Sequence, residues 1–222
     1  MNQTTQTYKK NKTNQLSFMS TKDTLKQRQS IRKYTNQPVS DKLILEILET
    51  ASWAPSAHNA QPWRFIVVSD IETKQSLAKA MAQAWIKDQA KDNKIVKQGT
   101  LDFSVKRFST APVLIVTCLS LENIKQYLDD KTRWLIERDL AVQSLGAAIE
   151  NLLLSASENN LGACWFSTPM FCKDVVRQVL GVPKNVEPQA IILMGYSNEK
   201  PIVKQRKPFE EFCFRNRWNK PI

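Results

Sequence analysis

Basic side chains alternate with a hydroxyl group in the stretch RQSIRKY. Arg28, Ser30 and Arg32 occupy every second position, so their side chains share one face if this segment is extended. Two guanidinium groups and a hydroxyl on one face suit a phosphate group. A later stretch, VKQRKP, adds Lys204 and Arg206. Together the two sets of cations predict a binding site for a phosphate-bearing ligand.

A polar loop, APSAHNAQPWRF, covers residues 54–65 and contains the only histidine of the chain, His58. Its Pro, Ser and Asn content disfavours both helix and strand, although the flanking segments have the patterns of buried elements. Ser56 beside His58 is not a nucleophile–base arrangement, and a single histidine leaves little room for a histidine-based triad. For His58 the sequence therefore favours a local hydrogen bond.

Composition limits the class of protein further. The 222 residues suit one domain, and 32 Lys and Arg against 21 Asp and Glu give a net charge of +11. This excess favours phosphate-bearing cofactors, nucleic acid or acidic membranes, or else a basic surface without a specific partner. The five glycines form neither G-x-G-x-x-G nor a P-loop, so we expect neither a Rossmann dinucleotide site nor a nucleoside triphosphatase.

Metal binding, export and membrane insertion are not expected either. The four cysteines have no C-x-x-C spacing, and one histidine adds little, so a zinc site is disfavoured. Cysteines in apolar stretches suggest reduced thiols and a cytoplasmic location. The first residues lack the apolar core of a secretory signal. We also find no apolar run of the roughly 18 residues that a membrane span needs.

The elements that must position these residues alternate along the chain. Ser40 is a predicted N-cap for a helix over 41–52, Gly162 is the expected stop after the longest helix, and Gly181 closes a short one. We expect helices at 41–52, 71–91, 133–159 and 173–180, and strands at 64–69, 112–120, 163–167 and 189–195. This order predicts an α+β or α/β sandwich in one domain.

Both ends of the chain differ from its middle in composition. Residues 1–22 are rich in Asn, Gln, Thr and Lys and are expected to form a disordered arm. Residues 23–196 would form the domain. Residues 197–222 contain four aromatic side chains between prolines, so we expect this C-terminal arm to wrap over the domain or over a partner subunit. The long helix is apolar on several sides and also calls for a further partner.

Several motifs, in this order, resemble the FMN-dependent nitroreductase family: RQSIRKY, APSAHNAQPWRF, NLLLSASENNLGACW, and VEPQAIILMGYSNEKP followed by RKPFEEF. The resemblance covers about residues 25–218. It implies an α+β, three-layer sandwich in which helices flank a central, mostly antiparallel sheet. It also implies an intertwined homodimer with two FMN molecules at the subunit interface, each held by both chains.

The resemblance assigns site residues in four groups. Arg28, Ser30 and Arg32, with a backbone contact from Gln29, would hold the phosphate and ribityl chain, and Lys204 and Arg206 would close on the phosphate. The loop of the partner subunit would line the flavin edge with Pro55, Ser56, Asn59 and Gln61. The stretch after the long helix would lie over the isoalloxazine ring with Trp165, Phe166, Ser167 and Thr168. No side chain is expected to be catalytic, because the flavin carries the chemistry.

The implied activity is transfer of hydride from NAD(P)H to a small organic acceptor by a ping-pong mechanism. The stretch WFSTPM lacks the acidic residue that many nitroreductases have there, and the sequence also resembles the flavin domain attached to gamma-glutamyl ligases of deazaflavin-cofactor synthesis. A flavin- or deazaflavin-binding module without NAD(P)H turnover of its own is therefore an alternative. A third interpretation, a basic nucleic-acid-binding protein, lacks a binding motif, so we expect no specific nucleic-acid or membrane partner.

Overall fold

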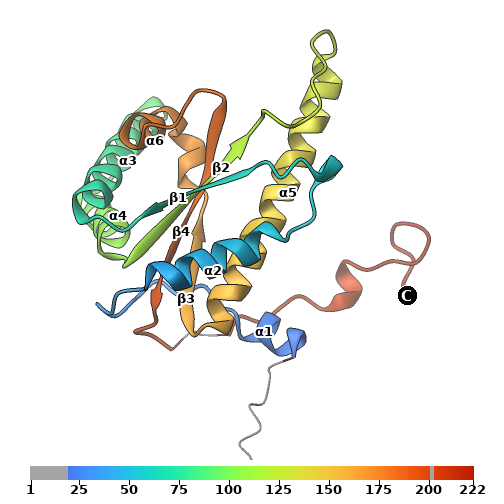
Figure 1. Ribbon diagram of the computed structural model, residues 1–222, viewed down its shortest axis with the longest axis horizontal. Helices are drawn as coiled ribbons and strands as arrows, with labels where there is room; N and C mark the ends of the chain where they lie inside the picture. Colours follow the sequence, from blue (N-terminus) through green and yellow to red (C-terminus); the bar gives the residue numbers. More distant parts are fainter. Residues whose placement is uncertain (1–19, 201–202) are drawn as a thin grey trace, which may run out of the picture.

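The computed structural model describes residues 20–200 and 203–222 of the chain. Four strands form one sheet in the order β1-β2-β4-β3, and each neighbouring pair is antiparallel (Figure 1). The strands are β1 (Trp63–Val68), β2 (Val113–Ser120), β3 (Leu161–Phe166) and β4 (Val186–Tyr196). The α-helices are α1 (Thr21–Gln27), α2 (Asp41–Ser52), α3 (Ile71–Lys91), α4 (Gln98–Thr110), α5 (Lys131–Glu158) and α6 (Lys173–Leu180).

Helices cover both faces of the sheet and give three layers. α2 and α5 lie on one face, and α3, α4 and α6 lie on the other (Figure 1). Every residue of β2 is buried, which follows from its central place between two helical layers. Its side chains alternate, so that Ile115 joins the α2/α5 core while Leu114 and Val116 join the α3/α4/α6 core. The α+β sandwich expected from the sequence is confirmed.

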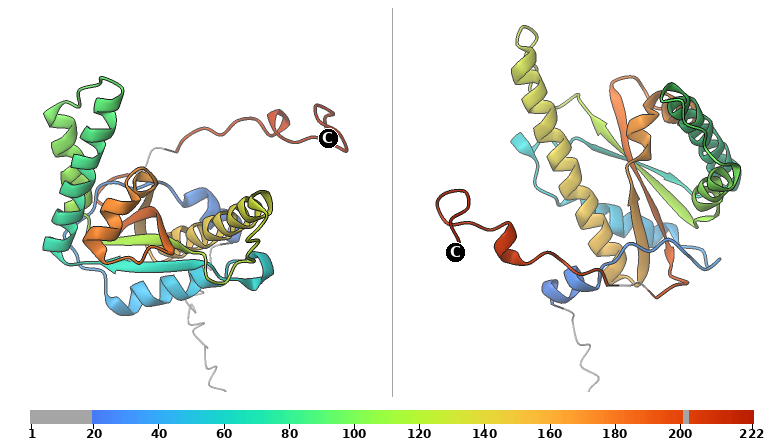
Figure 2. Two further views of the ribbon diagram at one scale, coloured as in Figure 1. Left: turned by 90° about the horizontal axis from the view of Figure 1, so that it is seen from above. Right: turned by 180° about the vertical axis from the view of Figure 1, so that it is seen from behind.

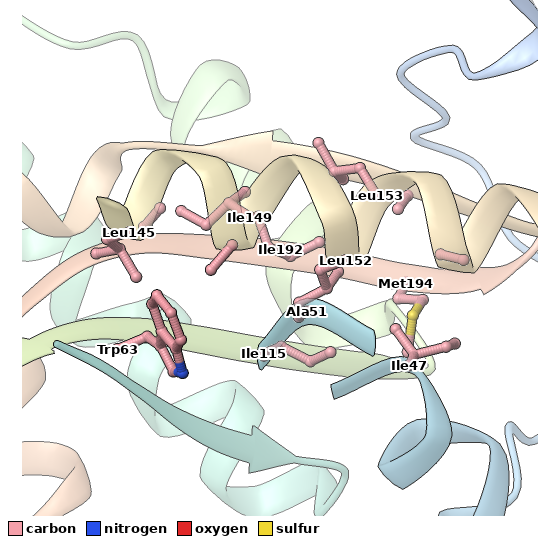
Figure 3. Packing of buried hydrophobic residues seen from close by; sticks show 14 of the residues in the cluster. Ile47, Ala51, Trp63, Ile115, Leu145, Ile149, Leu152, Leu153, Ile192 and Met194 are labelled. Atoms are coloured by element: carbon pink, nitrogen blue, oxygen red, sulfur yellow. The ribbon is translucent and has the colours of Figure 1, made fainter. Parts of the chain in front are cut away.

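The long helix α5 packs along the sheet and supplies much of one core. Leu145, Ile149 and Leu152 are buried and lie over the strands, with Trp63 of β1 beneath them (Figure 3). By length and composition alone, α5 contains an 18-residue stretch apolar enough to cross a membrane, with a mean hydropathy of 1.2. It is the one such helix among the described residues, and half of that apolar stretch is buried inside the fold, as in a core helix.

The eight elements expected from the sequence are all present. Ser40 caps α2 by accepting a hydrogen bond from the Leu43 backbone N–H at 3.3 Å, and Gly181 ends α6 with a left-handed φ of 67°. The sequence analysis missed α1 and α4. The apolar spacing of Leu101, Val105 and Phe108 in α4 was a usable signal, because these positions recur at the spacing of one helix face.

The role predicted for Gly162 is wrong. α5 ends at Glu158, and the left-handed residue of the turn after it is Asn160, with a φ of 59°. Gly162 lies inside β3, where a Cβ would stand 2.5 Å from the Ile31 side chain. The glycine is therefore needed for the close approach of residue 31 to the sheet edge, and not to stop the helix.

The two predicted arms have different outcomes. Most of the N-terminal arm, 1–19, lies outside the described residues, while residues 20–22 belong to the start of α1, which Ser20 caps at 3.2 Å. The C-terminal residues 203–222 extend away from their own domain (Figure 2). Phe209, Phe212 and Trp218 are exposed there. A single chain thus leaves this tail uncovered, and its packing on a partner subunit stays a prediction.

Candidate functional site

The segment that carries the first basic motif is fixed to the free edge of β3. The Ile31 N–H donates to the Ala163 carbonyl at 3.0 Å, and Ser30 forms a parallel bridge with Ala163. Further along, the Tyr34 hydroxyl donates to the Ile31 carbonyl at 2.6 Å. Burial of Ile31 in the gap left by Gly162 anchors the segment. The neighbours of Ile31 in the sequence are therefore held in place while remaining exposed.

A cavity of about 400 Å³ gathers both predicted sets of cations. Its lining consists of Arg28, Gln29, Ser30, Arg32, Glu199, Lys200, Lys204 and Arg206. The structure thus brings together all six residues that were expected to hold a phosphate and ribityl chain. Five basic side chains face a single carboxylate in this lining. A concave surface of one charge sign concentrates the field and favours an anionic ligand.

Arg28 forms an ion pair at the edge of this cavity. Its Nε atom lies 3.2 Å from Oε1 of Glu150 on α5. Nε is nevertheless buried without a hydrogen-bond partner among the described residues, so the contact has the geometry of an ion pair rather than of a hydrogen bond. A buried donor without an acceptor costs folding free energy. A ligand oxygen would relieve this cost, so the unsatisfied atom marks the cavity as a site for an acceptor-rich group.

Glu199 was missed by the sequence analysis although it lies within a motif that carries the resemblance. Its Oε1 accepts hydrogen bonds from the backbone N–H groups of Arg32 at 2.6 Å and Lys33 at 3.3 Å. The carboxylate therefore fixes the turn of the backbone at Arg32 from the far end of β4. Glu150 was missed as well. The sequence around a helical carboxylate does not show which arginine it will pair with, because the pairing depends on tertiary packing.

The polar loop after α2 has an unusual backbone. His58, Asn59 and Gln61 all have left-handed φ values, of 56°, 53° and 45°. Such conformations are unfavourable for residues with a side chain and persist where surrounding contacts enforce them, commonly at functional sites. Ser56 Oγ accepts from the Gln61 N–H at 3.1 Å, and Ser144 Oγ of α5 accepts from the Ala57 N–H at 3.2 Å.

His58 contacts a residue far away in the sequence, instead of forming the local hydrogen bond that was expected. Its Nε2 lies 3.5 Å from Oε2 of Glu137 on α5, a carboxylate that is 11% exposed. Pro55, Asn59 and Gln61 are exposed in the single chain, whereas Trp63, which follows them in the sequence, is buried. The loop is therefore a polar surface anchored to α5, in which the exposed Gln61 side-chain amide donates a hydrogen bond to Asn59 Oδ1 at 3.3 Å.

Within one chain, the loop and the cationic cavity are far apart. The loop contacts α5 at Glu137, whereas Arg28 contacts the same helix at Glu150. Thirteen residues of α-helix span about 20 Å, and Figure 1 shows the end of α2 and helix α1 at separate places along α5. The structure thus brings the predicted residues together in two groups rather than one, with the loop and the cationic cavity at different places along α5.

The third predicted group lies at the end of β3. Ser30 is bridged to Ala163, and three further residues of strand, about 10 Å, lead to Phe166. Trp165 is 40% exposed, and its indole N–H donates to Ser167 Oγ at 3.1 Å. Phe166, Ser167 and Thr168 line a separate cavity on the α3/α4 side of the sheet. The cationic cavity and the stretch from Trp165 to Thr168 thus both lie along the edge of β3.

Comparisons with known proteins identify the family. A model of the nitroreductase family matches residues 25–196. The chain belongs to the nitroreductase family. It is therefore an oxidoreductase of the nitroreductase type, as the motifs predicted.

Individual relatives span nearly the whole domain. YfhC of Bacillus subtilis (strain 168), whose name assigns it provisionally as an NAD(P)H nitroreductase, is 32% identical over 190 residues, or 86% of this chain and 91% of its own. A BluB-like flavoprotein from Clostridium difficile 630 is 30% identical with a TM-score of 0.73, covering 90% of this chain and 100% of its own. An FMN-dependent nitroreductase from C. difficile R20291 is 26% identical with a TM-score of 0.65, covering 88% and 98%.

Proposed function

We propose that this protein binds FMN and catalyses transfer of hydride from NAD(P)H to a small organic acceptor by a ping-pong mechanism. One observation carries the proposal: the residues of two distant basic motifs meet around one cavity at the edge of β3. Among the relatives, one is named an FMN-dependent nitroreductase and another is called a flavoprotein. We draw the cofactor from these names and from the chemistry of the cavity.

The residues of the cavity fit a flavin mononucleotide. Its phosphate would contact four cations of the lining, those of Arg28, Arg32, Lys204 and Arg206. The buried Nε–H of Arg28 would then gain a hydrogen-bond acceptor. Charge-assisted hydrogen bonds of this kind are about twice as strong as neutral ones. Ser30 adds a hydroxyl on the same edge. The strand from there to Phe166 gives the length over which an elongated ligand can lie.

When bound, FMN would supply the chemistry of hydride transfer between NAD(P)H and the acceptor. The chain supplies binding and orientation. Trp165 and the polar groups of Ser167 and Thr168 form the surface after β3 that would face the ring. No described side chain is required as a general acid or base in this scheme. The protein's contribution is to hold the reacting partners at fixed positions.

We further propose that the active form is a homodimer in which residues 23–196 of each chain form the flavin-binding domain and residues 197–222 wrap over the partner. The loop lies about 20 Å along α5 from the cationic cavity of its own chain, so a partner's loop would complete each site. Trp53, at the end of α2, is 81% exposed, and Ile136 of α5 is 54% exposed. Interfaces of obligate dimers commonly bury more than about 2,000 Å².

Two measurements test the proposed function. Purified protein should be yellow, or become yellow on addition of FMN, and should oxidise NADH or NADPH in the presence of nitro compounds, quinones or enones. A protein that binds FMN but is inert to both hydride donors would favour the binding-module alternative. A protein that binds no FMN under any condition would contradict the proposal as a whole.

A further inference from the structure

A second cavity lies on the sheet face opposite α5. It has a volume of about 460 Å³ and is lined by residues of α3, α4 and the turn that follows β3. Its walls include the aromatic side chains of Trp85, Phe108, Phe166 and Phe171. Pockets for small organic ligands commonly have volumes of about 300–1,000 Å³ and mostly apolar walls. The size and lining therefore suit a molecule with one or two rings.

Arg107 of α4 gives this cavity a specific charge. Its guanidinium carbon lies 4.5 Å from the ring centre of Phe103 and 5.3 Å from that of Phe166. These contacts hold the flat guanidinium against aromatic rings and leave its N–H edge available. Within residues 20–200 and 203–222, Arg107 forms no ion pair with a carboxylate. Its charge is thus not neutralised locally.

One carboxylate, that of Asp88, also lines the cavity. Its Oδ1 lies 3.2 Å from the Nζ of Lys91 on the next turn of α3, so its charge is already paired. Cys172 contributes a thiol, and burial raises its pKa to about 11, which keeps it neutral near pH 7. Arg107 is therefore the one charged side chain of the described lining that has no ion-pair partner, and the uncharged polar side chains of Gln89, Ser104, Ser167 and Thr168 accompany mostly apolar walls. Such a lining favours an aromatic anion over a neutral or cationic aromatic molecule.

We propose that this cavity binds planar aromatic carboxylates, with the ring among the aromatic walls and the carboxylate on Arg107. Aromatic walls favour flat rings through offset and edge contacts, and the guanidinium group matches the two oxygens of a carboxylate. The cavity shares Phe166, Ser167 and Thr168 with the stretch assigned to the flavin. This inference rests on the proposed function. If the flavin lies beside this stretch, the cavity selects which acceptor molecules can bind.

The binding itself can be measured without turnover. Oxidised protein, with and without FMN, is titrated calorimetrically with 4-nitrobenzoate and with the neutral 4-nitrobenzyl alcohol, in the absence of NAD(P)H. Arg107→Gln should weaken 4-nitrobenzoate binding about 5- to 10-fold, because one partly exposed charge-assisted contact is lost. Binding of the neutral compound should change less than about twofold. Lys106→Gln, at the exposed neighbouring position on α4, is the matched control.

A second variant locates the ligand. Ala84→Phe adds a ring to the α3 wall of the cavity and should weaken both compounds, while circular dichroism and the unfolding transition show that the fold is kept. The proposal is overturned if Arg107→Gln binds 4-nitrobenzoate as tightly as wild type, or if the wild-type protein binds neither compound. Absence of hydride transfer, with this binding intact, would instead contradict the proposed function alone.

Discussion

The Nε atom of Arg28 lies 3.2 Å from the Glu150 carboxylate and still has no hydrogen-bond partner among the described residues. The pairing joins the segment before β1 to the C-terminal half of α5. It holds the guanidinium at the edge of the cationic cavity and leaves part of its hydrogen-bonding capacity unused. An arginine fixed in this way loses little side-chain entropy when an anion arrives, which favours binding.

Replacement of Arg28 by Ala is expected to weaken FMN binding about 10- to 100-fold, since a charge-assisted phosphate contact is worth roughly 1.5–3 kcal/mol. Fluorescence titration of apoprotein with FMN measures the change. Lys42→Ala is the control, because that side chain is 88% exposed and paired only weakly with Glu46 at 3.8 Å. Equal FMN affinity in wild type and Arg28→Ala would show that the phosphate lies elsewhere.

Gly162→Ala should disturb the cationic cavity indirectly, by displacing the segment that contains Ile31. The new Cβ would stand 2.5 Å from Ile31, so the segment carrying the cations must shift. Forced overpacking of this kind costs about 1–3 kcal/mol of stability, and FMN affinity should fall several-fold with it. Gly99→Ala is the matched control, because nothing lies within 4 Å of its Cβ position. Urea unfolding and FMN titration of both variants measure the difference, and equal behaviour would contradict the packing argument.

The sequence predicted most of the elements because their signals are local. Strand β2 is apolar at most positions, α2 has a cap and an apolar stripe, and the alternation of Arg28, Ser30 and Arg32 lies within one stretch of seven residues. The separation of loop and cavity along α5 was not predictable in the same way. It depends on which turn of the long helix each segment contacts, and that is decided by packing rather than by any one stretch.

The missed residues illustrate the same limit. Glu150 and Glu137 are carboxylates on a helix with many polar positions, and only tertiary contacts distinguish them from solvent-facing neighbours. Gly162 was interpreted as a helix stop because glycine after a helix commonly has that role. The structure assigned that turn to Asn160. The close approach of Ile31, a residue more than a hundred positions earlier, explains the glycine instead.

Acid should destabilise the protein through Glu187. Burial alone would raise the pKa of this carboxyl, but hydrogen bonds from Arg138 at 2.7 Å and Lys173 at 2.6 Å lower it to about 2 from its ordinary 4.5. The folded state therefore binds this proton less readily than the unfolded chain. The resulting stabilisation is complete above about pH 4.5 and is lost as the pH falls towards 2.

The loss should approach, as an upper limit, about 3 kcal/mol of unfolding free energy between these two pH values. Urea unfolding from pH 5 downwards measures it. Glu187→Gln should be less stable than wild type at pH 7, because two cations lose their partner, and should show a flatter decline with acid. Glu158→Gln, an exposed position at the end of α5, should follow wild type. A variant at 187 that declines as steeply as wild type would contradict the assignment.

The proposed dimer, in which each flavin site combines residues of two chains, can be tested by mixing two variants. One variant carries Arg28→Ala in the cationic cavity, and the other carries Asn59→Gly in the loop. Glycine at position 59 removes the amide side chain but keeps the left-handed backbone, where φ is 53°, at little steric cost. If each flavin site combines the cavity of one chain with the loop of the other, both homodimers contain two damaged sites.

A mixed dimer of these variants would then contain one doubly damaged site and one intact site. Refolding the two variants together, followed by separation on different affinity tags, should give mixed dimers with about half of wild-type activity. Each parent homodimer, refolded alone, provides the baseline. The alternative is that each chain builds its own site, in which case a mixed dimer retains two singly damaged sites. Activity no higher than the mean of the two parents, in mixed dimers identified by mass, would establish that alternative.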